Sequence, residues 1–173
     1  MIYGPLELVD GRWVLGDAQR PGGRWVGFEP DGLVHHAEGT QGELIPWSRI
    51  MPGVGLQIGH GTKGSGYWGD VGLTGLLGGL PGPFQGRGGG HLSMTLRHPY
   101  EYRKLTFDRH PTWYRTAHVL LLAELLTHAV SEGDAHRLGD AEWLTWAVGR
   151  LETVGSWPLG HQPADVLQKS LSG

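Results

Sequence analysis

Cysteine is absent from the 173 residues of the chain. Without cysteine there is no disulfide, no thiolate nucleophile, no cysteine-ligated zinc and no iron–sulfur cluster. Long apolar runs are absent as well. No stretch approaches the ~20 residues that a membrane-spanning helix needs, and the first residues lack the basic and apolar regions of a signal peptide. We therefore expect a cytoplasmic protein without a transmembrane segment.

An excess of positive charge is also missing. Lysine and arginine number 14, against 17 aspartate and glutamate residues, which gives a formal net charge of −3. The chain as a whole therefore attracts neither nucleic acid nor an anionic membrane, and nucleic acid is not an expected partner. A local cationic patch can still form, and we take Arg97 and Arg103 as candidate binding residues. The other cations near predicted strands are Arg20, Arg24, Lys104 and Arg109.

Two residue types are abundant. The chain has 31 glycines, well above the usual ~7% of residues, and 8 tryptophans. Glycine widens the range of backbone conformations, and tryptophan buries a large apolar area. This composition predicts a well-packed body that carries long loops of special shape.

Residues 1–58 have the pattern of short strands separated by turns. Asp10-Gly11 favours a type I′ turn, and Glu29–Gly32 has the composition of a second turn. Pro46 favours an edge strand or a strand end, and Ser48–Ile50 suits one helical turn. The predicted strands are Leu6–Val9, Arg12–Leu15, Arg24–Phe28, Leu33–Ala37 and Glu43–Trp47.

Residues 53–90 form a glycine-rich insertion. They hold 16 of the 31 glycines and three charged residues. Because a disordered linker contains more charge, we favour one or two short strands with wide loops packed on the body. An apolar loop that contacts a partner or lipid, and plain disorder, stay open as alternatives. The candidate contact residues are Leu73, Leu76, Leu77, Leu80 and Phe84.

Strand pattern resumes over residues 91–107. Leu92, Met94 and Leu96 alternate with polar residues, which predicts one buried and one solvated face. His98-Pro99 interrupts this strand, and Arg103–Phe107 supplies its partner. We expect these strands and those of residues 1–58 to belong to one antiparallel sheet system.

Helices are predicted after the strands. A leucine- and alanine-rich stretch predicts the first helix over 111–132, with Pro111 at its first position and Gly133 as its stop. Asp140 is a favoured N-cap for a second helix over 141–152.

Few motifs point to chemistry. Gly59–Gly64 fits G-x-G-x-x-G, but the residues after it cannot open a helix, so we expect no dinucleotide. No serine has the surroundings of a nucleophile, and there is no cysteine. The ten histidines show no metal-ligand spacing, and we expect neither a metal nor a cofactor. A spatial cluster of His35 or His36 with His91 or His98 stays open.

Asp108-Arg109-His110 combines an acid, a cation and an imidazole between the last predicted strand and the first helix. This group is either an active-site corner or a helix cap with local ion pairs, and we favour the cap because an acid before a helix is electrostatically stabilising.

The order strand, turn, strand, turn and then IPWSRI resembles the opening of bacterial pleckstrin-homology-like domains of unknown function. The likeness is carried by Trp25–Phe28, Gly32–His35 and Leu44–Ile50, and it covers residues 5–131. The resemblance implies an antiparallel, barrel-like sheet capped by a helix, and binding to lipids, peptides or partner proteins. The chain departs from the family in its insertion, its additional helix and its lack of the basic signature K-x-n-[K/R]-x-R, so a phosphoinositide ligand is not expected.

We therefore expect one α+β domain over residues 1–173, with a barrel-like antiparallel sheet followed by C-terminal helices. The expected function is a non-enzymatic module that contacts a protein or a lipid surface, with self-association as a further possibility. The alternative is an enzyme with a histidine-lined polar pocket, and Asp108 and His110 are its candidate residues.

Overall fold

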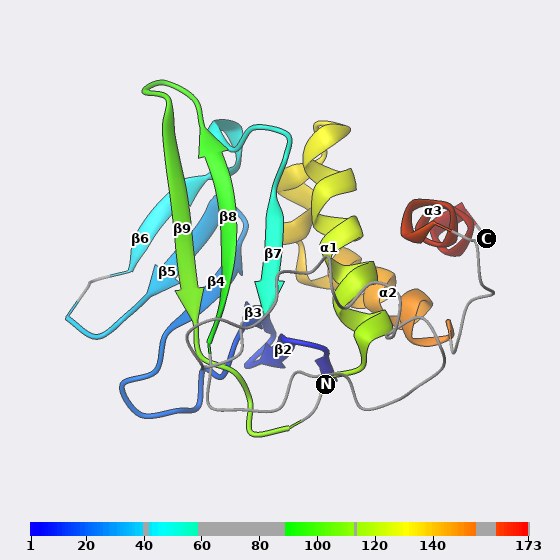
Figure 1. Cartoon of the computed structure of the whole chain (residues 1–173), viewed down its shortest axis with the longest axis horizontal. Helices are drawn as coiled ribbons and strands as arrows, with labels where there is room; N and C mark the ends of the chain where they lie inside the picture. Colours follow the sequence, from blue (N-terminus) through cyan, green and yellow to red (C-terminus); the bar gives the residue numbers. More distant parts are fainter. Residues whose placement is uncertain (40–41, 59–88, 113, 155–161, 173) are drawn as a thin grey trace, which may run out of the picture.

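The computed structural model describes residues 1–39, 42–58, 89–112, 114–154 and 162–172. Its strands form two antiparallel sheets, one of six strands in the order β1 to β6 and one of three in the order β7-β8-β9. Figure 1 shows the smaller sheet in front of the larger one. The strands are β1 Ile2–Tyr3, β2 Leu6–Val9, β3 Arg12–Leu15, β4 Trp25–Glu29, β5 Gly32–His36, β6 Glu43–Pro46, β7 Gly55–Ile58, β8 Gly90–Leu96 and β9 Glu101–Phe107.

The hairpins of the larger sheet have the predicted turns. Asp10 and Gly11 have φ values of +48° and +78°, as a type I′ turn requires. In the next hairpin, Glu29 pairs with Gly32. A Cβ at Gly32 would meet the backbone of Ile45 at 2.1 Å, so only glycine permits this approach of β5 to β6.

At both ends the smaller sheet makes backbone hydrogen bonds to residues that flank strands of the larger sheet. At one end Met51 N donates to Thr95 O and Arg97 N donates to Arg49 O, each at 2.9 Å. At the other end Asp108 N donates to Arg24 O at 2.7 Å. Apart from an isolated bridge between Ile50 and Leu96, no ladder links the sheets in the described ranges. The predicted α+β fold is therefore confirmed, but its sheets do not close into a barrel.

Three α-helices follow the sheets: α1 Thr116–Ser131, α2 Ala141–Glu152 and α3 Pro163–Ser172. Short 3₁₀ helices are η1 Trp47–Arg49 and η3 Ala135–Gly139. Helix α1 lies beside β7, and α2 and α3 lie on the far side of α1 (Figure 1). One buried hydrophobic cluster contains side chains of both sheets and all three helices. No helix of the described residues has the length and apolarity needed to cross a membrane.

The first helix begins later than predicted. The sequence pattern placed its start at Pro111, whereas α1 begins at Thr116. The residues before α1 are instead held by hydrogen bonds between His110 and Tyr114, which use the backbone N–H of His110 outside a helix. The predicted stop is correct, because Gly133 has a φ of +80° just after the helix end.

Candidate functional site

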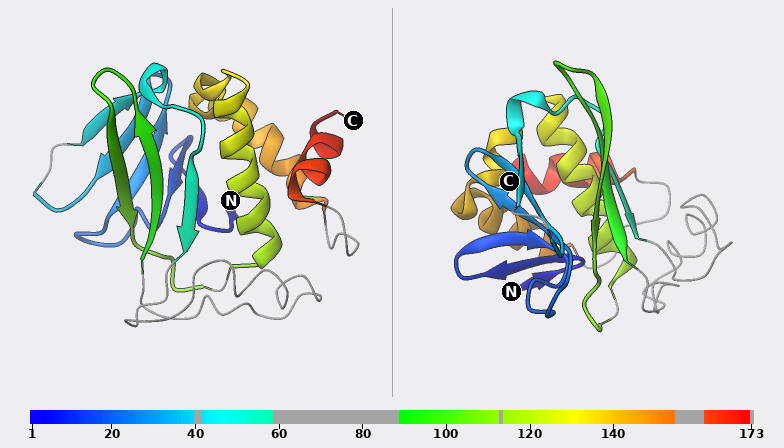
Figure 2. Two further views of the ribbon diagram at one scale, coloured as in Figure 1. Left: turned by 45° about the horizontal axis from the view of Figure 1, so that its top comes forward. Right: turned by 90° about the vertical axis from the view of Figure 1, so that its left-hand side faces the viewer.

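The residues predicted to bind a partner are placed as follows. Leu73, Leu76, Leu77, Leu80 and Phe84 lie outside the described residues. Arg97 and Arg103 lie at the β8–β9 hairpin, whose turn is at the outer end of the molecule next to η1 (Figures 1 and 2). The hairpin is therefore the part of the predicted binding surface that the structure describes.

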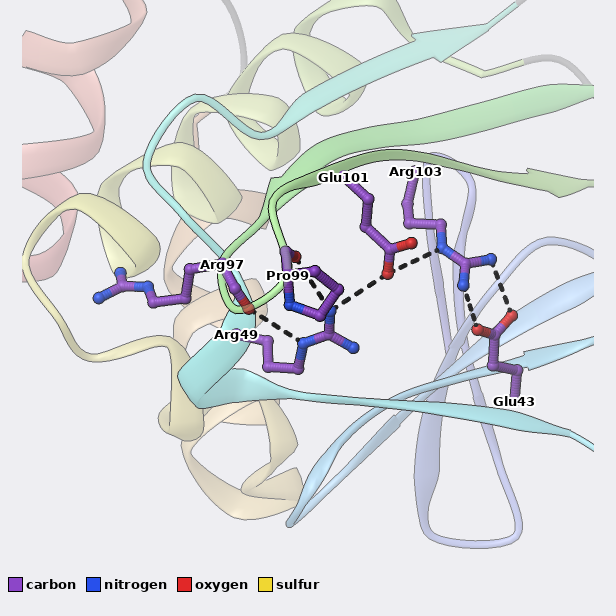
Figure 3. A network of polar contacts seen from close by, with 6 residues as sticks. All are labelled: Glu43, Arg49, Arg97, Pro99, Glu101 and Arg103. Carbon is purple, nitrogen blue, oxygen red and sulfur yellow. Dashed lines mark hydrogen bonds and ion pairs between the residues drawn. The ribbon is translucent and has the colours of Figure 1, made fainter.

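Arg103 is part of a network of alternating charges (Figure 3). Its guanidinium contacts both carboxylate oxygens of Glu43, at 2.8 and 3.3 Å. Its Nε also lies 3.3 Å from Glu101 Oε1, at an angle that does not make a hydrogen bond. Glu101 in turn accepts a hydrogen bond from Arg49 Nη2 at 3.2 Å. Since Glu43 is in β6 and Arg49 in η1, this network attaches β9 to the larger sheet and neutralises Arg103.

The side chain of Arg97 does not take part in this network. Its carbonyl accepts a hydrogen bond from Arg49 Nε at 3.2 Å, but its side chain points away from the network (Figure 3). The side chain is exposed, and no acidic residue of the described ranges pairs with it. The structure thus separates the two predicted arginines into one with paired charge and one with free charge.

Exposed aromatic and cationic side chains lie along the same hairpin as Arg97. Tyr100 and Tyr102 are 71% and 67% exposed, and the ring centroids of His98 and Tyr100 are 5.6 Å apart. Lys104 is exposed on the same side of β9 as Tyr102 and has no ion pair within the described ranges. We call Arg97, His98, Tyr100, Tyr102 and Lys104 the hairpin surface.

Strand β9 is the edge strand of the smaller sheet. Among the described residues it pairs with β8 alone, and Tyr102 lies opposite Thr95, whose carbonyl bonds Met51 rather than β9. This pair is therefore of the non-hydrogen-bonded type, and the N–H and C=O of Tyr102 point away from β8. The same alternation applies to Lys104. At the next outward position, Thr106, the carbonyl is occupied by His35 Nε2 at 2.9 Å.

The other candidate residues lie at the opposite end of the sheets, in a buried polar cluster. Glu7 Oε2 lies 3.1 Å from His110 Nε2, and Glu7 Oε1 accepts a hydrogen bond from Gln19 at 3.2 Å. His110 Nδ1 lies 2.8 Å from the hydroxyl of Tyr114, which also accepts the backbone N–H of His110. The hydroxyl therefore donates to Nδ1, which assigns the imidazole proton to Nε2 and its donation to Glu7.

This cluster holds elements of the fold together. Both ring nitrogens of His110 are engaged by protein groups, Nε2 by Glu7 and Nδ1 by Tyr114. Burial raises the pKa of Tyr114 to about 12, which keeps the phenol protonated. The cluster connects β2 to the chain before α1.

Asp108 does not cap a helix, which corrects the preferred interpretation of the sequence. It accepts hydrogen bonds from the backbone N–H and the guanidinium of Arg24 at 2.8 and 2.9 Å, and it lies well before Thr116. Burial by itself raises the pKa of Asp108, but the hydrogen bonds and charge of Arg24 outweigh it and leave the pKa below its usual range. Asp108 therefore ties β4 to the end of β9.

The two histidines of β5 make separate contacts. His36 stacks on Trp25 with ring centroids 3.6 Å apart, and His35 bonds the Thr106 carbonyl. No group of three potential metal ligands occurs within the described part of the chain.

Sequence reasoning did not find the buried cluster, because Glu7 and His110 are 103 residues apart. One local signal was available: Glu7 is an acid inside the apolar strand Leu6–Val9. Comparison of the chain with protein-family models, with curated proteins and with solved structures finds no match in any of the three.

Proposed function

We propose that this chain is a non-enzymatic binding module, and that its ligand is an extended segment of a partner protein which adds to the open edge of β9. The observation that carries the proposal is that the backbone groups of Tyr102 and Lys104, which point away from β8 and pair with no other described strand, lie beside the exposed side chains of the hairpin surface.

The free edge supports strand addition. An extended peptide bonds the N–H and C=O groups of an edge strand, and side chains on either side of the edge select its sequence. Tyrosines are enriched at protein interfaces because they bury a large area and keep a polar hydroxyl. Tyr100 and Tyr102 supply such side chains beside the free backbone.

The charge of the hairpin surface favours an acidic partner. The charges of Arg103, Glu43 and Glu101 are paired in the network described above, which leaves Arg97 and Lys104 as cations without acidic partners among the described residues. Complementary charge speeds association and disfavours the wrong partners. A segment that combines acidic and apolar side chains therefore fits this surface best.

We also propose that the chain is related to bacterial pleckstrin-homology-like domains and that it is located in the cytoplasm. Two antiparallel sheets followed by a helix are compatible with that relationship. The fold by itself does not specify a ligand, so the functional argument depends on the hairpin surface. Contacts made by Leu73, Leu76, Leu77, Leu80 and Phe84 stay a prediction.

Peptides selected from a displayed library of random sequences are the probe that tests this function. We expect selected peptides to be acidic and to shift the amide resonances of Tyr102 and Lys104. Lys104→Pro removes the outward N–H, which an edge strand tolerates, and should weaken binding about tenfold or more. Lys104→Thr keeps that N–H and should weaken binding much less.

Trp146→Gln, at the exposed tryptophan of α2, is the control for loss of an exposed aromatic and should leave the affinity unchanged. Equal affinities for Lys104→Pro and Lys104→Thr would show that the edge is not used. Vesicles of phosphatidylcholine and phosphatidylserine form a second arm. Vesicle binding that is lost in Tyr102→Ser would identify lipid as the ligand and contradict the proposal.

A further inference from the structure

The connection between β9 and α1 contains a buried arginine without an anionic partner. Arg109 keeps 7% of its surface exposed, and its Nε and Nη1 atoms are buried with no hydrogen-bond partner. None of the ion pairs between described residues includes it. Burial lowers the pKa of Arg109, and the charge and hydrogen bond of Tyr114, rather than a carboxylate, act against that effect.

The nearby carboxylates are already engaged. Glu7 interacts with His110 and Gln19, and Asp108 interacts with Arg24. A buried charge without a paired counter-charge is unfavourable for folding. Tyr114 interacts with the guanidinium, but Nε and Nη1 stay buried without an acceptor among the described residues.

The guanidinium is held in a defined orientation. Its central carbon lies 5.0 Å from the centroid of the Tyr114 ring, within the range of a cation–π interaction. The Tyr114 hydroxyl is itself fixed by the backbone N–H and the ring of His110, at 2.9 and 2.8 Å. The donors of Arg109 are therefore positioned before any ligand binds.

We propose that Arg109 anchors a binding site for a carboxylate group of a ligand. Nε and Nη1 each share one donor edge of the planar guanidinium with Nη2. A carboxylate can accept two parallel N–H···O bonds from either edge. Glu7 is linked to Arg109 through the His110–Tyr114 pair, and Asp17 raises the pKa of Tyr114. Two acidic neighbours favour a singly charged carboxylate over a doubly charged phosphate.

Entry to this site requires a local opening, because little of Arg109 is exposed. Residues 108–110 and 114–115, on either side of the ring contact, have no regular secondary structure. The site is at the other end of the sheets from the hairpin surface, so it stands or fails independently of the proposed function.

The test compares sodium acetate with sodium chloride at equal ionic strength, with sulfate and phosphate as further arms. In the wild-type protein we expect acetate to shift the NMR signal of Arg109 Nε–H and to raise the thermal unfolding midpoint above that in chloride. Arg109→Met should abolish the acetate effect. The matched control is Arg137→Met, at an exposed arginine of η3 whose guanidinium also lies over an aromatic ring, that of Trp143, and it should keep the effect.

Two further measurements separate a ligand site from a structural arginine. Arg109→Lys keeps the charge but lacks the planar fork, so acetate should bind about tenfold more weakly. In chloride alone, Arg109→Met should unfold at the wild-type midpoint or above it, because it removes a desolvated cation. The proposal is overturned if acetate does not raise the unfolding midpoint of the wild type above that in chloride. It is also overturned if acetate raises the midpoint of Arg109→Met by the same amount. Stronger shifts with sulfate or phosphate overturn the carboxylate assignment, and a lower midpoint of Arg109→Met in chloride indicates a structural role.

Discussion

His118 illustrates how one side chain links the first strand to the first helix. Its ring stacks on that of Tyr3, with centroids 4.2 Å apart, and burial together with the charge of Arg115 lowers the pKa of His118 to about 4. The imidazole is therefore neutral in the folded protein at neutral pH, and protonation of this group opposes the packing of β1 on α1.

This shift predicts a pH dependence of stability. The folded-state pKa is about 4 and the unfolded value 6.5, so the unfolded chain binds more protons between these values. The stabilisation is complete above pH 6.5 and decreases as the pH falls towards 4, with a slope of at most about 1.4 kcal/mol per pH unit. Urea unfolding of the wild type and His118→Gln across this range measures the contribution.

The control for this prediction is His136→Gln, at an exposed histidine of η3, which should keep the wild-type profile. Parallel profiles of the wild type and His118→Gln would show that His118 does not titrate in the way its burial implies.

Contacts between residues far apart in the chain could not be predicted from the sequence. Arg24 and Asp108 are 84 residues apart, and no spacing rule connects them. The sequence placed Asp108 beside a helix because an acid before a leucine-rich stretch is usually a cap. Here a tertiary ion pair replaces that local role. Arg97 and Arg103 were both identified as cations on strands, but only the geometry shows that Arg103 is paired.

At the scale of elements, the features that depend on neighbouring residues were predictable. Asp10-Gly11 forms its turn because both residues reach positive φ at little cost. Asp140 caps α2 by accepting the N–H groups of Glu142 and Trp143 at 3.0 and 3.1 Å. The start of α1 was not predictable, because it is set by the contacts of His110 with Glu7 and Tyr114.

The two main helix starts differ in a way that predicts their response to substitution. Arg115, the N-cap of α1, makes no side-chain capping bond, and the first turn of α1 has no acidic residue. Arg115→Asp adds a cap and a favourable charge at the helix N-terminus, so it should raise the free energy of unfolding by about 1 kcal/mol. Asp140→Ala removes the existing cap of α2 and should lower it by about 1 kcal/mol.

Arg115→Ala separates the new cap from the loss of the cation, and chemical denaturation of the three variants supplies the free energies. Equal stabilities of Arg115→Asp and Arg115→Ala would show that the start of α1 gains nothing from a cap, and hence that tertiary contacts alone fix it.

For the whole molecule, the shared hydrophobic cluster bears on whether sheets and helices unfold together. Leu92 of β8 and Leu122 of α1 both belong to it and are almost completely buried. The indole N–H of Trp13, in β3, also donates to Thr145 of α2 at 3.0 Å, which ties the larger sheet to a C-terminal helix. Few contacts of this kind would be expected between separately folding parts.

We therefore predict a single cooperative transition. Far-UV circular dichroism, which follows the helices, and the indole resonance of Trp13, which follows the larger sheet, should give the same denaturation midpoint. Leu122→Ala should destabilise the protein by about 3–5 kcal/mol and shift both probes equally, because the cavity it leaves in α1 belongs to the common core. If the helical signal moved to lower denaturant while the Trp13 resonance kept its wild-type midpoint, the sheets would be stable without the helices, and the chain would consist of more than one folding unit.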